Sequence, residues 1–158
     1  MKKAQIMGQP IIFIFIAIVA ILTLTLGIKY VYKLKVLGEE TQVVRELKEI
    51  EADLQRIYQL SYQSSEKFTY SFPSSVNKIC FLKESRDINR LDLEEQERIY
   101  IESSTNKNVF IFTEPMGKYR TTYSKFVGTT NCFGIDGKID LIFTNNGQTV
   151  TITQVTIS

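Results

Sequence analysis

Residues 11–28 read IIFIFIAIVAILTLTLGI, and no charged side chain interrupts this run or the residues back to Ala4. An α-helix needs roughly 20 apolar residues to cross a hydrocarbon layer about 30 Å thick. Tyr30 and Tyr32 follow the run, where an aromatic ring with a polar tip suits a membrane interface. The sequence therefore predicts a transmembrane helix over residues 10–32.

Lysines flank this apolar run on both sides. Lys2 and Lys3 precede it, and Lys29, Lys33 and Lys35 follow it. Their ammonium groups can extend to lipid headgroups, but a positive charge at both ends leaves the orientation of the helix undecided. The chain has 19 basic and 17 acidic residues, a net charge of +2. We attribute this small excess to headgroup contact and expect no nucleic-acid partner.

Three interpretations fit the apolar run. A secretory signal peptide has an apolar stretch of about 7 to 15 residues and a small-x-small cleavage site. Here the run is longer and ends in Leu26-Gly27-Ile28-Lys29. A plain single-span anchor is the simplest interpretation. The third depends on the residues that precede the run.

Lys2-Lys3-Ala4-Gln5, followed by a short polar stretch and the apolar helix, resembles the class III signal of archaeal type IV pilin-like proteins. The resemblance implies that a prepilin-type signal peptidase cuts on the cytoplasmic side, after Lys3 and Ala4 and before Gln5. It also implies that the helix stays with the mature protein. There it would hold the subunit in the lipid bilayer, and later pack against copies of the chain in a filament.

Gln9 occupies the fifth position of the mature chain in this resemblance. Pilins usually carry glutamate there, which is thought to pair with the N-terminal amine of the neighbouring subunit. An amide can accept a hydrogen bond but supplies no charge. Gln9 is therefore the candidate residue for subunit assembly, with Pro10 directly after it.

A second helical pattern follows the apolar run. Charged residues lie between its apolar positions, which are spaced 4, 3, 4 and 3 residues apart. The apolar positions are Val43, Leu47, Ile50, Leu54 and Ile57. We expect one long helix from about Pro10 to about Tyr62, whose amphipathic part, residues 33–63, packs on a folded head. The alternative is a juxtamembrane coiled coil.

Residues 64–158 alternate with a period of two and predict an antiparallel sheet. The expected strands cover residues 67–72 and 76–82, a hairpin of 98–103 (RIYIES) with 109–114 (VFIFTE), and a meander of 132–135, 138–143 and 149–157. Asp136-Gly137 is expected to form a type I′ turn within the meander. Residues 86–96 suit a loop or a short surface helix. The predicted fold class is α+β, a long N-terminal helix packed on a small antiparallel β-sheet head.

Cys80 and Cys132 both lie in strand-like sequence. Two cysteines cannot complete a tetrahedral zinc site in a chain without histidine. If the head is outside the cell, a disulfide between them is expected. The alternative is a pair of reduced cysteines in the core.

No catalytic, cofactor or metal site is predicted, and we expect the protein not to be an enzyme. The chain has no histidine, and its eight glycines are scattered singly rather than gathered in a phosphate-binding loop. The acidic residues Asp92, Glu94, Glu95 and Glu97 lack the spacing of a calcium loop and are interpreted as a solvated helix face.

Basic and aromatic residues alternate in one further segment: Lys118, Tyr119, Arg120, Tyr123 and Lys125. Such a strand could contact nucleic acid or polysaccharide. An exposed face or edge strand explains the pattern as well, and we favour that interpretation.

Two functions from different classes fit these features. The first is a structural pilin-like subunit that assembles into a surface filament or pseudopilus. The alternative is a membrane-tethered extracytoplasmic binding module that does not polymerise. Either way we expect a single-pass cell-membrane protein with a cytoplasmic N-terminus and an extracytoplasmic head. The expected divisions are a leader (1–9), transmembrane helix (10–32), amphipathic helix (33–63) and head (64–158).

Overall fold

The computed structural model describes residues 9–83, 88–89, 91–104, 106–114 and 120–155. The chain divides into two compact units, Met1–Glu40 and Thr41–Ser158. Helix α1, Gln9–Gln59, begins in the first unit and ends in the second. The predicted long helix and the α+β class are therefore confirmed, whereas the predicted boundaries at residues 9, 32 and 63 stay predictions.

The first unit consists of the N-terminal part of α1. Pro10 lies in the first turn, where its missing N–H would have had no helical partner. From Ile12 to Lys35 every residue is exposed within the chain. Within the described part of the chain, these helix residues therefore bury no apolar side chain.

The second unit contains the amphipathic part of α1 and the strands that the structure describes. The five apolar residues of the predicted stripe are at most 5% exposed: Val43, Leu47, Ile50, Leu54 and Ile57. They belong to one hydrophobic cluster with residues of both sheets. The stripe packs on the head as predicted, so a coiled coil is not needed to cover it.

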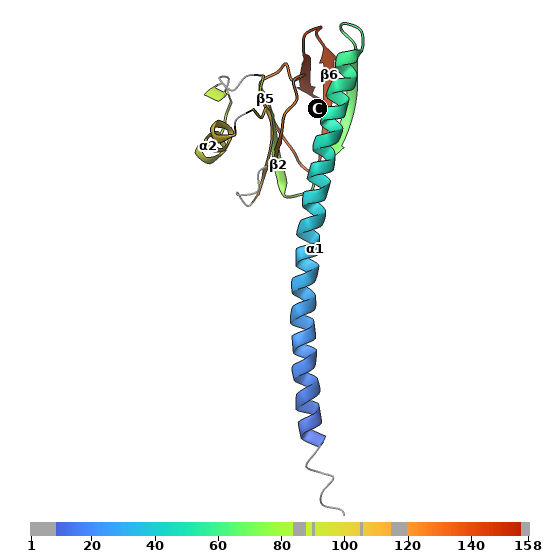
Figure 1. The fold of residues 1–158 in the computed structure, drawn as a ribbon, viewed down its shortest axis with the longest axis vertical. Helices are drawn as coiled ribbons and strands as arrows, with labels where there is room; N and C mark the ends of the chain where they lie inside the picture. The colour runs from blue at the N-terminus through green and yellow to red at the C-terminus, as the bar shows by residue number, and fades with distance from the viewer. Residues whose placement is uncertain (1–8, 84–87, 90, 105, 115–119, 156–158) are drawn as a thin grey trace, which may run out of the picture. The chain divides into compact units, whose positions relative to one another are not determined.

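In the described parts of the head, seven strands form two antiparallel sheets. Figure 1 shows these sheets beside α1. The three-stranded sheet has the order β1-β6-β7, and the four-stranded sheet has the order β4-β3-β2-β5. The strand bounds are β1 Ser65–Ser71, β2 Val76–Phe81, β3 Val109–Thr113, β4 Arg120–Thr122, β5 Asn131–Gly134, β6 Lys138–Asn145 and β7 Val150–Gln154. Pairing of β6 with β7 confirms the last hairpin of the predicted meander.

The two central strands of the four-stranded sheet, β2 and β3, bury side chains on both faces. Ile79 and Ile111 point into the cluster that contains the α1 stripe. Their even-numbered neighbours Cys80 and Phe110 point into a second cluster, which includes Ile101 of helix α2, Glu95–Ser103. In Figure 1, α1 and α2 accordingly lie on opposite sides of β2. The alternation along β3 and from Ile79 to Phe81 of β2 follows from the two-residue period of a strand. A register shift between Val76 and Lys78 interrupts it and places Val76 in the same cluster as Ile79.

The predicted strand RIYIES is wrong, because these residues belong to α2. The helix begins with a capping box, in which the Glu94 side chain accepts from the N–H of Glu97 and Glu97 accepts from that of Glu94. Ile101 is buried on one side, whereas Ile99 is 59% exposed. The alternation of apolar residues in RIYIES suggested a strand, but the cap and a single buried face select a helix.

The predicted pairing of the strands around Asp136-Gly137 is also wrong. β5 pairs with β2 of one sheet, while β6 pairs with β1 and β7 of the other. The Ile135 N–H donates to the Asn77 carbonyl, and the Phe72 N–H donates to the Gly137 carbonyl. Of the two turn residues, only Gly137 has a positive φ, +69°, so the turn is not type I′. Asp136 and Gly137 instead connect β5 in one sheet to β6 in the other.

The end of α1 is fixed by a residue from β6. Asn145 is 3% exposed, and its amide donates to the carbonyls of Tyr58 and Leu60 at 3.1 and 2.8 Å. The last carbonyls of a helix have no partner within it. Asn145 therefore supplies hydrogen-bond donors to carbonyls at the C-terminal end of α1 and links this end to the three-stranded sheet.

Candidate functional site

The apolar part of α1 is the most distinctive surface of the chain. Its window of highest hydropathy averages 2.6, and none of that window is buried. By length and composition, this helix can cross a membrane. Large apolar side chains on all sides are exposed, from Ile12 at 58% to Leu34 at 67%. A continuous apolar surface of this size requires lipid or another protein as its environment.

Two hydroxyl groups interrupt the apolar surface, and both are bonded within the helix. The Thr23 hydroxyl lies 3.0 Å from the carbonyl oxygen of Val19 and 2.9 Å from that of Ala20. The Thr25 hydroxyl contacts the equivalent carbonyls one turn before it. An unpaired polar group is costly in hydrocarbon, and this arrangement removes that cost.

Aromatic and basic residues follow directly on the same helix. Tyr30 and Tyr32 are 65% and 71% exposed, and Lys29, Lys33 and Lys35 are exposed as well. Tyrosine and lysine at the end of an apolar helix are typical of the headgroup region. The described part of α1 thus combines an apolar segment long enough to cross a membrane with one end that suits the membrane interface.

The predicted leader residues Lys3, Ala4 and Gln5 lie outside the described residues. Gln9 is the first residue of α1, and its side chain is not among those described. Cleavage between Ala4 and Gln5 and a role of Gln9 in assembly therefore stay predictions.

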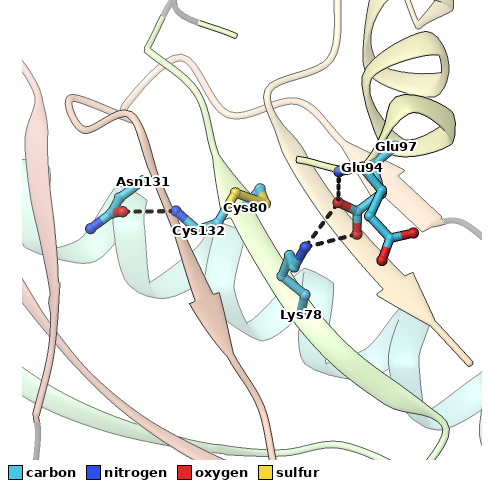
Figure 2. The surroundings of a disulfide bond; sticks show 6 residues. All are labelled: Lys78, Cys80, Glu94, Glu97, Asn131 and Cys132. Carbon is cyan, nitrogen blue, oxygen red and sulfur yellow. Dashed lines mark hydrogen bonds and ion pairs between the residues drawn. A yellow bond between two sulfur atoms is a disulfide. The ribbon is translucent and has the colours of Figure 1, made fainter. Parts of the chain in front are cut away.

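The predicted disulfide between Cys80 and Cys132 is present. The two residues are direct partners in the β2–β5 register, with their Cα atoms 4.0 Å apart. Figure 2 shows the bond linking the neighbouring strands. It closes a loop over a sequence separation of 52 residues, for which the chain-entropy model gives about 4 kcal/mol. Such a contribution is large for a head of this size.

An ion pair beside the disulfide attaches α2 to β2 (Figure 2). The Lys78 ammonium donates to both carboxylate oxygens of Glu97, at 2.9 and 2.8 Å. The Glu97 side chain is 5% exposed and also accepts from the Glu94 N–H at 3.0 Å. The interpretation of Glu97 as part of a solvated acidic face is therefore wrong. Its three hydrogen bonds compensate for the burial of its charge.

Polar residues beside the apolar stripe connect α1 to β1. The Tyr70 hydroxyl donates to Asp53 at 2.8 Å. The Ser71 N–H donates to Glu46 at 3.3 Å, and Gln42 donates to the Ser71 carbonyl at 2.9 Å. Burial, and then the bond to Asp53, raise the pKa of Tyr70 far above its ordinary value. The sequence alone did not predict these contacts, although Gln42, Glu46 and Asp53 share the helical spacing of the stripe.

A surface cluster on the three-stranded sheet has a different character. Lys67 and Thr69 of β1 both contact Asp140 of β6 at 2.6 Å. The hydrogen bond from Lys67, and then that from Thr69, lower the pKa of Asp140. The three residues stabilise the pairing of β1 with β6, and the Asp140 carboxylate accepts hydrogen bonds from the other two.

The basic and aromatic segment is described only in part. Lys118 and Tyr119 lie outside the described residues, and β4 is an edge strand, as favoured by the sequence. Tyr123 and Lys125 follow β4 and are exposed. Within the described ranges, no group of three or more histidine, cysteine or acidic residues could hold a metal ion.

No family model, curated protein or solved structure matches this chain. Its architecture is pilin-like, a long apolar N-terminal helix followed by an antiparallel β-sheet head. Inference of function therefore depends on this architecture and on the chemistry of individual side chains.

Proposed function

We propose that the chain is a pilin-like structural subunit, anchored by its N-terminal helix and able to assemble into a surface filament or pseudopilus. The observation that carries the proposal is the continuity of α1. One helix has an apolar part with no partner among the described residues and a second part whose stripe covers the strands of the head. In this function the bilayer surrounds the apolar part before assembly, and copies of the same helix surround it afterwards.

The proposed topology places the N-terminus in the cytoplasm and the head outside the cell. The disulfide supports a location of the head outside the cell, because disulfide bonds persist in oxidising compartments. The sequence before the helix, Lys3-Ala4-Gln5, is proposed as the substrate of a prepilin-type signal peptidase.

The intact mass of the chain, extracted from membranes of cells that process it, tests this proposal. We expect a chain that begins at Gln5. Ala4→Leu should block the cut, because the peptidase requires a small residue there, whereas Ala20→Leu makes the same change inside the apolar run and should leave processing unchanged. A chain with its first four residues intact would contradict the proposal, and one that begins near Lys29 would indicate an ordinary signal peptide.

Assembly is tested separately by mechanical shear. A filament is released from cells by shear as a high-molecular-weight species, whereas a membrane tether stays with the cells. We expect release of the wild-type chain and less release of Gln9→Ala, with equal amounts of both in the membrane before assembly.

The alternative function is a membrane-tethered binding module that does not polymerise. The observation that favours it is Gln9, which lacks the charge that glutamate gives to pairing between pilin subunits. A processed or unprocessed chain that shear never releases would select this alternative.

A further inference from the structure

A groove opens on the head beside the C-terminal end of α2. Its volume is about 460 Å³, within the usual range for small-ligand sites of about 300–1,000 Å³. The segments that line it are residues 82–83 after β2, Ile88, the end of α2, the turn before β3, and residues 123–127 after β4. The sequence pattern that alternated basic and aromatic residues therefore ends at this groove.

The floor of the groove is apolar, and Asn108 links the segments on either side of it. Leu82 and Ile101 are 1% and 4% exposed. The Asn108 amide group donates to the Ser124 carbonyl at 2.6 Å, and its oxygen accepts from the Ser124 N–H at 2.8 Å. The backbone of Asn108 also bonds to Leu82 and Thr122. The groove is thus built before any ligand binds, which lowers the entropic cost of binding.

The rim of the groove is cationic. Lys83, Lys107 and Lys125 all line it and are all exposed. Among the described residues, none of the three forms a salt bridge. Elsewhere on the head, Lys67 and Lys78 each contact a carboxylate at 2.8 Å or less. The rim lysines are therefore available to an external anion.

Local structure positions two of these lysines. Asn106 has a φ of +60°, a conformation that asparagine tolerates, and this turn precedes Lys107. The Lys125 ammonium lies 5.1 Å from the centre of the Phe126 ring, which itself contacts the ring of Tyr58. Both positive charges thus have supported positions on the rim of the groove.

The rest of the rim suits a ligand with more than an anion. Tyr123 is 52% exposed and offers a ring face, and the Glu102 carboxylate can accept hydrogen bonds from hydroxyl groups. A bare anion would gain from the lysines and be repelled by Glu102. An acidic sugar would use both, and its ring could lie against Tyr123.

We propose that this groove binds an anionic saccharide, a sugar that carries carboxylate groups, with the rim lysines contacting the acid and Tyr123 contacting the ring. This function of the head is independent of whether the chain forms filaments. It gives either a filament subunit or a tether a means of attachment to acidic polysaccharide.

The test measures binding to the full chain in nanodiscs of zwitterionic phosphatidylcholine. The probes are trigalacturonate, galactotriose and inorganic phosphate, titrated by calorimetry at low and high salt. We expect trigalacturonate to bind about ten-fold more tightly than either of the others, and to weaken with salt. Equal binding of galactotriose, or equal binding of phosphate, would overturn the proposal, since the acid or the ring would then contribute nothing.

Matched substitutions locate the site. Lys107→Gln with Lys125→Gln should weaken trigalacturonate binding about ten-fold, whereas Lys48→Gln with Lys138→Gln removes the same charge outside the groove and should have little effect. Equal losses in the two pairs would overturn the proposal. If the Lys107→Gln, Lys125→Gln variant shifts the unfolding midpoint, trigalacturonate binding is compared instead between Tyr123→Ala and Tyr62→Ala. Only Tyr123→Ala should weaken binding, and an equal loss in both variants would also overturn the proposal.

Discussion

The two parts of α1 share one backbone conformation and differ in what surrounds their side chains. In the part from Ile12 to Leu34, apolar residues lie on every side and stay exposed, as Leu24 does at 65%. In the part from Thr41 to Gln59, apolar residues form one stripe, and Leu54 is fully buried. The comparison shows that apolar content alone does not create a core. The periodicity of the apolar residues decides whether a helix packs on a sheet or needs an external apolar environment.

The largest effect on this comparison is expected from loss of the disulfide. Replacing Cys80 and Cys132 by serine should destabilise the head by about 4 kcal/mol, because the unfolded chain gains the entropy of an open loop. Hydrogen exchange in nanodiscs should show faster exchange in residues 41–59 and unchanged exchange in residues 12–34. Equal acceleration in both parts would show that the apolar helix depends on the head for its structure.

The second largest effect compares one substitution at two positions. Leu54→Ala should cost about 2–5 kcal/mol of head stability, because it leaves a cavity in the core. Leu24→Ala removes the same atoms from the exposed apolar part and should leave head stability unchanged. Urea unfolding of the detergent-solubilised chain, followed by tyrosine fluorescence, measures both. Similar losses at the two sites would contradict the proposed division of the helix.

The contact between Tyr70 and Asp53 gives a smaller effect with a characteristic pH dependence. Tyr70→Phe should cost about 1–3 kcal/mol at neutral pH, because Asp53 loses a charge-assisted hydrogen bond. The pKa of Tyr70 is raised in the folded state. Its contribution is therefore complete below about pH 10, where an unfolded tyrosine ionises, and is lost as the pH rises further.

The alkaline loss is measured by unfolding of both chains between pH 8 and pH 11. Tyr70→Phe should lose less stability over this range than the wild-type chain. Tyr62→Phe is the matched control, because Tyr62 is 68% exposed. Parallel curves for Tyr70→Phe and the wild type would contradict the raised pKa.

The smallest effect is expected inside the apolar part. Thr23→Val should change membrane insertion by less than about 1 kcal/mol, because the hydroxyl is already bonded to the helix backbone. Ile21→Asp at a neighbouring position should oppose insertion by about 2.5–3.5 kcal/mol. A glycosylation-based insertion assay measures both changes. A large effect of Thr23→Val would indicate that its hydroxyl has a partner outside the chain.

The sequence predicted those features that depend on neighbouring residues. The extent of α1 and the burial of Leu47 and Ile50 follow from helical periodicity, and the β6–β7 hairpin follows from two alternating segments close in the chain. The disulfide remained one of two alternatives, because the sequence does not place Cys80 opposite Cys132. Only the pairing of β2 with β5 does so.

The errors in the sequence analysis involve residues that depend on distant partners. RIYIES has an alternating pattern that fits a strand, but the ion pair from Lys78 to Glu97 and the burial of Ile101 hold it as α2. The groove was missed for the same reason. Its three lysines come from separate segments, which the pairing of β3 with β2 and β4, together with the bonds made by Asn108, brings close to one another.

The sequence by itself determined a helix with an uncharged apolar part and an amphipathic part, because both patterns are complete within a few turns of one helix. The tertiary structure alone decided which sheet each strand joins, which carboxylates are buried, and which lysines line the groove. These outcomes depend on contacts between segments up to about 90 residues apart, such as Asn145 with Tyr58. The observed pairing is the one with the lowest free energy among alternative pairings of distant segments. A local sequence pattern does not indicate which of these pairings is the most stable.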